Sequence, residues 1–232
     1  MTKAPQAGKV KTRLTPPLTP EEAALLNTCF LRDLGNAISL AGEQAPAKGI
    51  GVYTPIGAES VYQKILPPDF FLIPQRGHDF GERLTLAMED LFKVGFRSVC
   101  LINSDSPTVP AASFAAAANE LAKPGDRMVV GPSDDGGYYL IGLKRLQRRL
   151  FEDIEWSTAR VLEQTLQRAT EIGLHVHQLP SGFDVDDRFT LQRLCQELLG
   201  DRAVNPEVAP KTREFLAEIV EREGRGRIWP NL

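Results

Sequence analysis

Helix-like and strand-like hydrophobic patterns alternate along most of this chain of 232 residues. Short apolar runs typical of buried strands are separated by stretches in which apolar residues recur every three or four positions. This alternation predicts an α/β fold, with a mostly parallel sheet covered by helices on both faces. We expect strands at 50–53, 70–73, 98–102, 128–131, 138–143 and 174–179, and helices at 20–42, 79–94, 111–122, 158–172 and 212–223.

Capping signals mark two helix starts in the sequence. Separately, the length of the chain, 232 residues, limits the number of domains. Thr19, Pro20 and Glu22 form a capping box with proline in the first turn, and Ser157 or Thr158 is expected to cap the helix that reaches residue 172. We expect one large α/β domain over residues 1–200, followed by a C-terminal helical extension over 201–232.

The composition favours a small-molecule partner in a reducing compartment. A net charge of −3 gives no electrostatic case for binding nucleic acid or an anionic membrane. Cys29, Cys100 and Cys195 lie far apart with no C-x-x-C spacing, which favours reduced thiols. No apolar run approaches 18 residues, and Met1–Leu14 is basic and lacks the apolar core of a signal peptide. We expect a soluble, cytoplasmic protein.

The predicted strand at 98–102 ends in a carboxylate. Ser104, Asp105 and Ser106 follow it directly, and Pro107 prevents its continuation. Ligands of open α/β sheets bind at the carboxyl ends of the strands, where a short carboxylate suits a hard divalent cation that carries phosphates. The alternative is that Asp105 forms an Asx-turn or caps the helix after Pro110.

The segment from Lys3 to Leu14 holds four cations and one glycine. Gly8 allows backbone N–H groups to form an anion-binding nest, while Lys11 and Arg13 suit a diphosphate. The segment is not a Walker loop, because G-x-x-x-x-G-K-[ST] is absent. The alternative is a solvated basic terminus.

Two further acidic segments have a structural and a functional interpretation. Asp135 with the two glycines after it could form a hairpin turn, or it could lie at a pocket floor, bind sugar hydroxyls and act as a general base. The carboxylates of 184–187 could cap a helix, or one of them could join Asp105 in holding a divalent ion. Trp156 precedes a helix cap and could line an acceptor pocket.

These segments, in this order, resemble the nucleotide-diphospho-sugar transferase superfamily of GT-A fold. Within it, the chain is similar to a glycosyltransferase-like family related to the 2-phospholactate and molybdenum-cofactor guanylyltransferases, whose members are labelled arsenosugar-biosynthesis or radical-SAM and selenium-domain associated. The resemblance covers residues 1–195. The matching motifs are K-x-P-x-P-G-x-V-K-T-R-L at Lys3–Leu14 with Ala7 in place of a proline, Gln75/Gly77/Asp79/Gly81/Arg83, Ser104–Pro107, Asp135–Tyr138, Trp156–Thr158 and Asp184–Asp186 followed by Asp187 in place of threonine.

The resemblance implies a three-layer, Rossmann-like GT-A fold with a mostly parallel mixed sheet, and a role for each motif. The nucleotide and its phosphates would contact Lys3, Pro5, Gly8, Lys11, Arg13, Gly81, Arg83 and Ser104. The sugar or acceptor would contact Asp135, Gly136, Gly137, Tyr138 and Trp156. Asp105 and Asp186 match the metal-binding carboxylates, with Mg²⁺ or Mn²⁺ as the ion.

The strand that precedes the lysine–proline loop in that family is not found before Lys3, so we expect the first strand of the sheet to be missing. Its loss would leave backbone groups unpaired in the centre of the sheet.

The leading hypothesis for function is a metal-dependent glycosyltransferase that uses a nucleoside-diphosphate sugar and a small-molecule acceptor. Asp135, Lys11 and Arg13 would be its catalytic residues. One alternative is a nucleotidyltransferase that takes a nucleoside triphosphate and releases pyrophosphate. The other is an inactive module that binds a nucleotide sugar.

Overall fold

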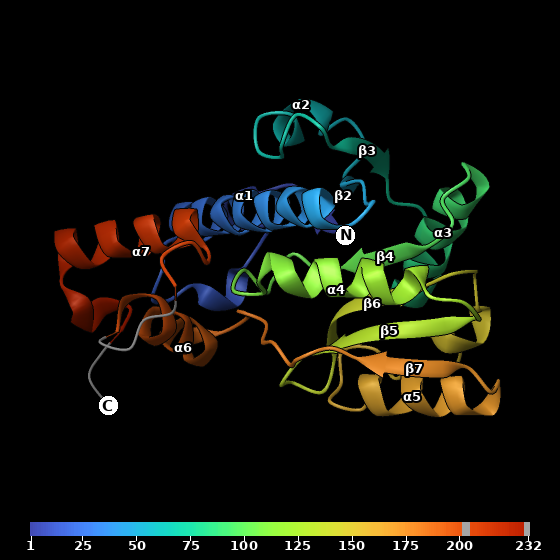
Figure 1. Ribbon diagram of the computed structural model, residues 1–232. Coiled ribbons are helices and arrows are strands. Elements are labelled where there is room, and N and C mark those ends of the chain that lie inside the picture. Colours follow the sequence, from blue (N-terminus) through green and yellow to red (C-terminus); the bar gives the residue numbers. More distant parts are fainter. Residues whose placement is uncertain (201–204, 230–232) are drawn as a thin grey trace.

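The computed structural model describes residues 1–200 and 205–229 and confirms the α/β class (Figure 1). The strands are β1 (Thr2–Lys3), β2 (Ile50–Thr54), β3 (Phe71–Pro74), β4 (Val99–Ile102), β5 (Arg127–Pro132), β6 (Tyr138–Leu143) and β7 (His175–Gln178). The helices are α1 (Pro20–Gln44), α2 (Glu59–Tyr62), α3 (Phe80–Lys93), α4 (Ala111–Ala122), α5 (Val161–Glu171), α6 (Arg188–Leu199) and α7 (Pro210–Glu223), with the 3-10 turns η1 (Thr12–Leu14), η2 (Arg148–Phe151) and η3 (Arg225–Arg227).

The strands form two hydrogen-bonded sheets rather than one continuous sheet. The first has the order β1-β2-β3 and is parallel. The second has the order β4-β6-β5-β7, in which β6 is antiparallel to both of its neighbours. The first strand, which the sequence leads us to expect to be missing, is present as the two residues of β1, which pair with Tyr53 and Thr54 of β2.

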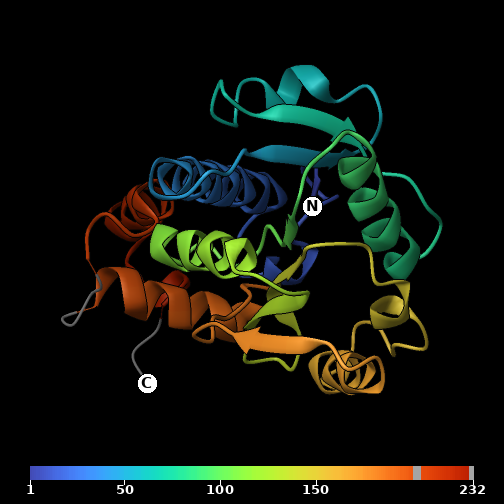
Figure 2. The same ribbon diagram turned by 45° about the vertical axis from the view of Figure 1, so that its right-hand side comes forward.

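Helices cover both faces of the strands, as the sequence predicts. Helices α1 and α4 lie side by side in both views and pack on one face with Val129 and Leu140 (Figure 1 and Figure 2). Helices α3 and α5 pack on the other face with Met128 and Val130. Successive residues of β5 therefore point into different layers, because side chains alternate along a strand.

A separate apolar cluster joins the N-terminal turn to the last helices. It contains residues of η1, α1, α6 and α7, among them Leu14, Phe30, Leu191 and Leu216. Asp33 of α1 also accepts hydrogen bonds from the first backbone N–H groups of α7. Residues 201–204, at the start of the expected extension over 201–232, lie outside the described part of the chain.

The predicted helix start at Thr19 is confirmed, and the one at Ser157 or Thr158 is wrong. The Thr19 side chain accepts from the Glu22 backbone, and the Glu22 carboxylate accepts from the Thr19 backbone. Helix α5 begins only at Val161, because Ser157 has a φ of 64° and residues 157–160 form a turn instead.

No helix within residues 1–200 and 205–229 is long and apolar enough to cross a membrane.

The carboxylate of Glu22 predicts a pH dependence of stability. It accepts hydrogen bonds from Arg222 and Arg227, and the bond from Arg227 holds the pKa of Glu22 below its ordinary value. This stabilisation is present above the unfolded-state pKa, near 4.3, and is lost as the pH falls through the folded-state pKa. Glu22→Gln should lower the free energy of unfolding by about 1 to 2 kcal/mol at pH 7. Urea unfolding at pH 7 and pH 3 should show the difference from wild type shrinking in acid, and an equal difference at both values would contradict the assignment.

Candidate functional site

Lys11 joins three segments that are far apart in the sequence. Its ammonium donates to the Val185 carbonyl at 2.9 Å and to Asp186 Oδ1 at 3.0 Å, and it forms an ion pair with Asp105. The side chain is only 6% exposed, and its Nζ lies 5.6 Å from the centre of the Phe30 ring. Burial lowers the pKa of Lys11, but the two carboxylates outweigh this and raise it above its ordinary value. Lys11 therefore carries a full charge at neutral pH.

The Asp105 side chain faces this site, because it neither forms the turn after β4 nor caps helix α4. Pro110 holds the N-cap position of α4, and no side chain caps that helix. The turn after β4 is made by Asn103, whose Oδ1 accepts from the Asp105 backbone N–H at 3.2 Å. The carboxylate of Asp105 is one-third exposed and points to Lys11.

Hydrogen bonds among three side chains, those of Asn103, Ser106 and Asp184, hold the segment of Asp105 next to the segment of Asp186. Asn103 Nδ2 donates to Asp184 Oδ1 at 2.8 Å, and the Ser106 hydroxyl donates to the same oxygen. Burial raises the pKa of Asp184, and the charges of Asp105 and Asp135 raise it further. The network ties the end of β4 to the segment that carries Asp186. The sequence pattern indicated no site role for Asn103, and it indicated Asp184 only as one carboxylate of the acidic segment 184–187.

Basic residues of the N-terminal loop line a cavity of about 300 Å³ at this point. The lining residues are Lys3, Lys9, Val10, Lys11, Thr12, Arg13, Asn27, Ser104, Asp105 and Asp186. Among the described residues, Arg13 and Lys9 form no hydrogen bond or ion pair through their side chains, so their charges face the solvent at the cavity. Lys3, Lys11, Arg13, Ser104, Asp105 and Asp186 are thus brought together, whereas Pro5 and Gly8 lie in the loop without lining the cavity.

Gly81 and Arg83 are placed at the start of α3 instead of in this cavity. A Cβ on Gly81 would lie 2.8 Å from Trp156 Nε1, so glycine permits the close approach of Trp156. Arg83 donates to the His78 carbonyl at 2.8 Å, within its own loop. Phe80 and Trp156 form an edge-to-face pair with ring centres 5.1 Å apart.

The turn between β5 and β6 places Asp135 beside the loop that carries Trp156. Asp135 is exposed, and its Oδ1 accepts from the Gly137 backbone N–H at 2.9 Å, which is the predicted turn geometry. Gly136 has a φ of 87°, and its carbonyl accepts from Leu162 at 2.8 Å. The structure does not bring the Tyr138 side chain to the surface here: its hydroxyl is buried, and burial raises its pKa.

Comparisons with known proteins include a solved structure that matches along nearly the full length of the chain. The crystal structure of a "putative nucleotide-diphospho-sugar transferase" from Desulfovibrio desulfuricans G20 has a TM-score of 0.82 and 30% sequence identity, over 96% of this chain and 95% of that chain. CMP:2-keto-3-deoxy-manno-octonic acid synthetase complexed with CTP has a TM-score of 0.42 and 14% identity, over 68% of this chain and 85% of that one. No curated protein matches the chain.

The comparisons agree with the fold that the sequence predicts. The first of these structures shares the Rossmann-like nucleotide-sugar transferase fold along nearly the whole chain. A family model described as "Uncharacterized protein conserved in bacteria (DUF2064)" matches residues 40–158, just over half of the sequence. The chain is a member of the DUF2064 family.

Proposed function

We propose that this protein is a glycosyltransferase that takes a nucleoside-diphosphate sugar as donor and a small molecule as acceptor. The observation that carries the proposal is the buried Lys11 ammonium between Asp105 and Asp186, in a cavity lined by further cations at the carboxyl end of β4. The full-length match to a protein described as a nucleotide-diphospho-sugar transferase supports it.

The cavity suits the diphosphate of such a donor. Lys3, Lys9 and Arg13 surround it with positive charge, and Arg13 can contact two phosphate oxygens at once. Lys11 can exchange a carboxylate oxygen for a phosphate oxygen without leaving the cavity. These cations would stabilise the negative charge that develops on the diphosphate as the bond to the sugar breaks.

Asp105 and Asp186 have suitable chemistry and exposure for a divalent cation. They already hold one cation between them, and their side chains are 33% and 50% exposed. Mg²⁺ is commonly bound through one or two carboxylates together with substrate phosphates. Within residues 1–200 and 205–229 there is no cluster of three or more side chains able to hold a metal, so the donor and water would complete the shell. Bound Mg²⁺ or Mn²⁺ would act as a Lewis acid toward the leaving diphosphate.

The acceptor would enter beside Asp135 and Trp156. One oxygen of Asp135 is held by the turn, which leaves the other available to orient an acceptor hydroxyl and take its proton. Phe80 is 49% exposed and packs against Trp156, so this pair offers an apolar surface to the acceptor.

The leaving group distinguishes this proposal from nucleotidyl transfer. A thermal-shift screen of nucleotides and nucleotide sugars, with and without Mn²⁺, should select the donor, because a ligand that binds the native state raises the unfolding midpoint. Incubation of that donor with the protein and a panel of hydroxylated acceptors, followed by separation of the nucleotides, should then show a nucleoside diphosphate as the sugar is transferred to an acceptor.

Two outcomes of this experiment would contradict the proposal. Release of pyrophosphate from a nucleoside triphosphate would assign the protein to the nucleotidyltransferases. Stabilisation by a nucleotide sugar without any release over many hours, in the presence of Mn²⁺ and a panel of hydroxylated acceptors, would instead assign a binding module.

A further inference from the structure

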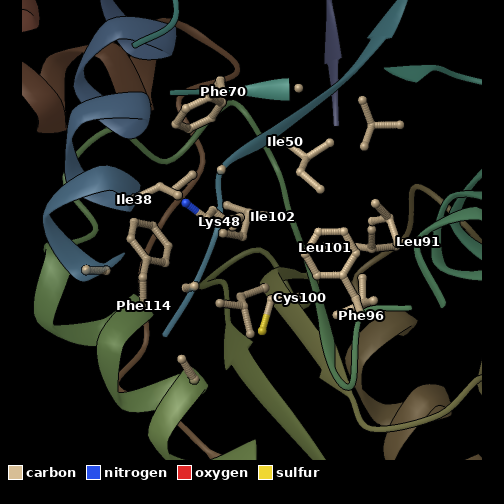
Figure 3. A pocket seen from close by; sticks show the side chains of 18 of the residues that line it. Ile38, Lys48, Ile50, Phe70, Leu91, Phe96, Cys100, Leu101, Ile102 and Phe114 are labelled. Carbon is tan, nitrogen blue, oxygen red and sulfur yellow. The ribbon is translucent and has the colours of Figure 1, made fainter. Parts of the chain in front are cut away.

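Two cavities of this protein differ in their chemistry. The larger one, of about 740 Å³, is lined mainly by apolar side chains, among them Ile38, Leu101 and Phe114 (Figure 3). The smaller one, at Lys11, is lined by cations and carboxylates. Its wall also includes the uncharged amide of Asn27, which comes from α1.

Asn27 occupies a position of α1 that faces the protein core. It is 4% exposed, and Ala23, one turn before it, and Phe30, one turn after it, are fully buried on the same side of the helix. The Phe30 ring lies 5.6 Å from Lys11 Nζ, so this side of the helix contacts the buried ammonium. Asn27 thus reaches the cavity from the helix face that packs against Lys11.

The amide of Asn27 has no hydrogen-bond partner among the described residues. Its Oδ1 is fully buried and unpaired, so Nδ2 is the end of the amide that reaches the cavity. Lys11 cannot donate to this Oδ1, because its N–H groups are already directed to the Val185 carbonyl and to two carboxylates. Both N–H groups of Nδ2 are therefore available to a ligand in the cavity.

An unpaired amide oxygen inside the protein is unfavourable for folding. Buried polar groups are nearly always hydrogen-bonded, and a group left without a partner costs the free energy of its desolvation. Thr28, the next residue of α1, shows the usual arrangement, since its hydroxyl donates to the Ala24 carbonyl at 3.0 Å. A leucine in place of Asn27 would have the same branched shape with no polar atom to bury. Packing alone therefore does not explain an asparagine at this position.

We propose that Asn27 is a phosphate-binding residue of the donor site, and that its Nδ2 donates to a phosphate oxygen of the bound diphosphate. This inference rests on the proposed function, which places a diphosphate in the cavity. Lys3, Lys9 and Arg13 supply positive charge there, and the amide adds a directed N–H donor without adding charge. An anion in the cavity favours the observed orientation, with Nδ2 outward and Oδ1 inside.

The test measures ligand affinity and stability of the full chain in parallel. Asn27→Leu keeps the branching of the side chain and removes the amide. Isothermal titration in the presence of Mg²⁺ should show about 10- to 100-fold weaker binding of inorganic pyrophosphate, and of the donor selected by the thermal-shift screen. The unfolding midpoint without ligand should stay the same or rise by up to about 4 °C, because an unpaired buried atom has been removed. A merely structural role of Asn27 would instead lower the midpoint and the affinity together.

Asn36→Leu is the matched control for this variant. Asn36 lies on the exposed side of the same helix and does not line the cavity. The same substitution there should leave the pyrophosphate affinity unchanged. Asn27→Ala is the second test variant, because the smaller side chain cannot overfill the site if leucine does. It should bind pyrophosphate as weakly as Asn27→Leu while remaining folded by circular dichroism.

Several results would overturn the proposal. Equal pyrophosphate affinity of wild type and the two Asn27 variants would remove Asn27 from the phosphate contacts, even if the nucleotide sugar binds more weakly. Loss of the fold in both variants would assign Asn27 a structural role. In these cases the wild-type chain still binds its ligands, so the proposed function stands. Absence of binding of both pyrophosphate and every nucleotide sugar to wild type would overturn the proposed function and this inference together.

Discussion

Asp105→Asn is expected to reduce turnover by about 100- to 1000-fold while the chain stays folded. The substitution keeps the size of the side chain and removes the charge that faces Lys11 and that would hold the divalent cation. The fold should tolerate it, because the local turn depends on Asn103 and on backbone hydrogen bonds of Asp105, including the one from Val185 N–H at 2.9 Å. Steady-state rates with the selected donor and Mn²⁺, together with circular dichroism of both proteins, measure the two expectations.

Asp69→Asn is the matched control for this variant. Asp69 is exposed and contacts the Ser39 hydroxyl, on a part of the chain that does not line the cavity. Its turnover should equal that of wild type. Undiminished turnover of Asp105→Asn would remove Asp105 from the site, and a loss accompanied by an unfolded spectrum would assign it a structural role instead.

The positions of the secondary-structure elements could be predicted because local patterns determine them. The helix at 111–122 and the strand at 138–143 begin and end at the predicted residues. Pro110 and Pro124 flank the apolar pattern of the helix, and Gly137 precedes the apolar run of the strand. The start of α5 could not be predicted from its capping pattern. There the turn at 157–160 is fixed by contacts with the hairpin of Gly136, which lie about 20 positions away in the sequence.

The site was partly predictable for a related reason. Asp105, Lys11 and Asp186 could each be selected by residue type and by position beside a strand or loop, and the structure brings them together. The sequence does not indicate that Lys11 occupies the space between the carboxylates, because that contact spans 175 positions. The sequence also does not show that the Tyr138 hydroxyl is buried, because the register between β5 and β6 shifts at Gly131 and Pro132.

Gly136→Ala is expected to destabilise the protein by about 3 to 5 kcal/mol and to lower the unfolding midpoint by roughly 10 °C. The φ of Gly136 is 87°, a conformation in which a side chain is strained. A Cβ there would also lie 2.1 Å from the Ala159 carbonyl oxygen, so the hairpin turn and the 157–160 loop would have to separate. Thermal and urea unfolding of the variant measure this loss.

Gly125→Ala separates the two causes of that loss. Gly125 has a similar φ of 84°, but a Cβ there would have only Arg127 Nη2 nearby, at 3.9 Å. It should lose about 1 to 2 kcal/mol, the cost of the backbone conformation alone. The excess in Gly136→Ala then measures the contact with Ala159, through which the turn of Asp135 and the loop of Trp156 hold one another in place. Equal losses of unfolding free energy in the two variants would show that the contact with Ala159 adds no destabilisation. The turn and the loop would then be positioned independently.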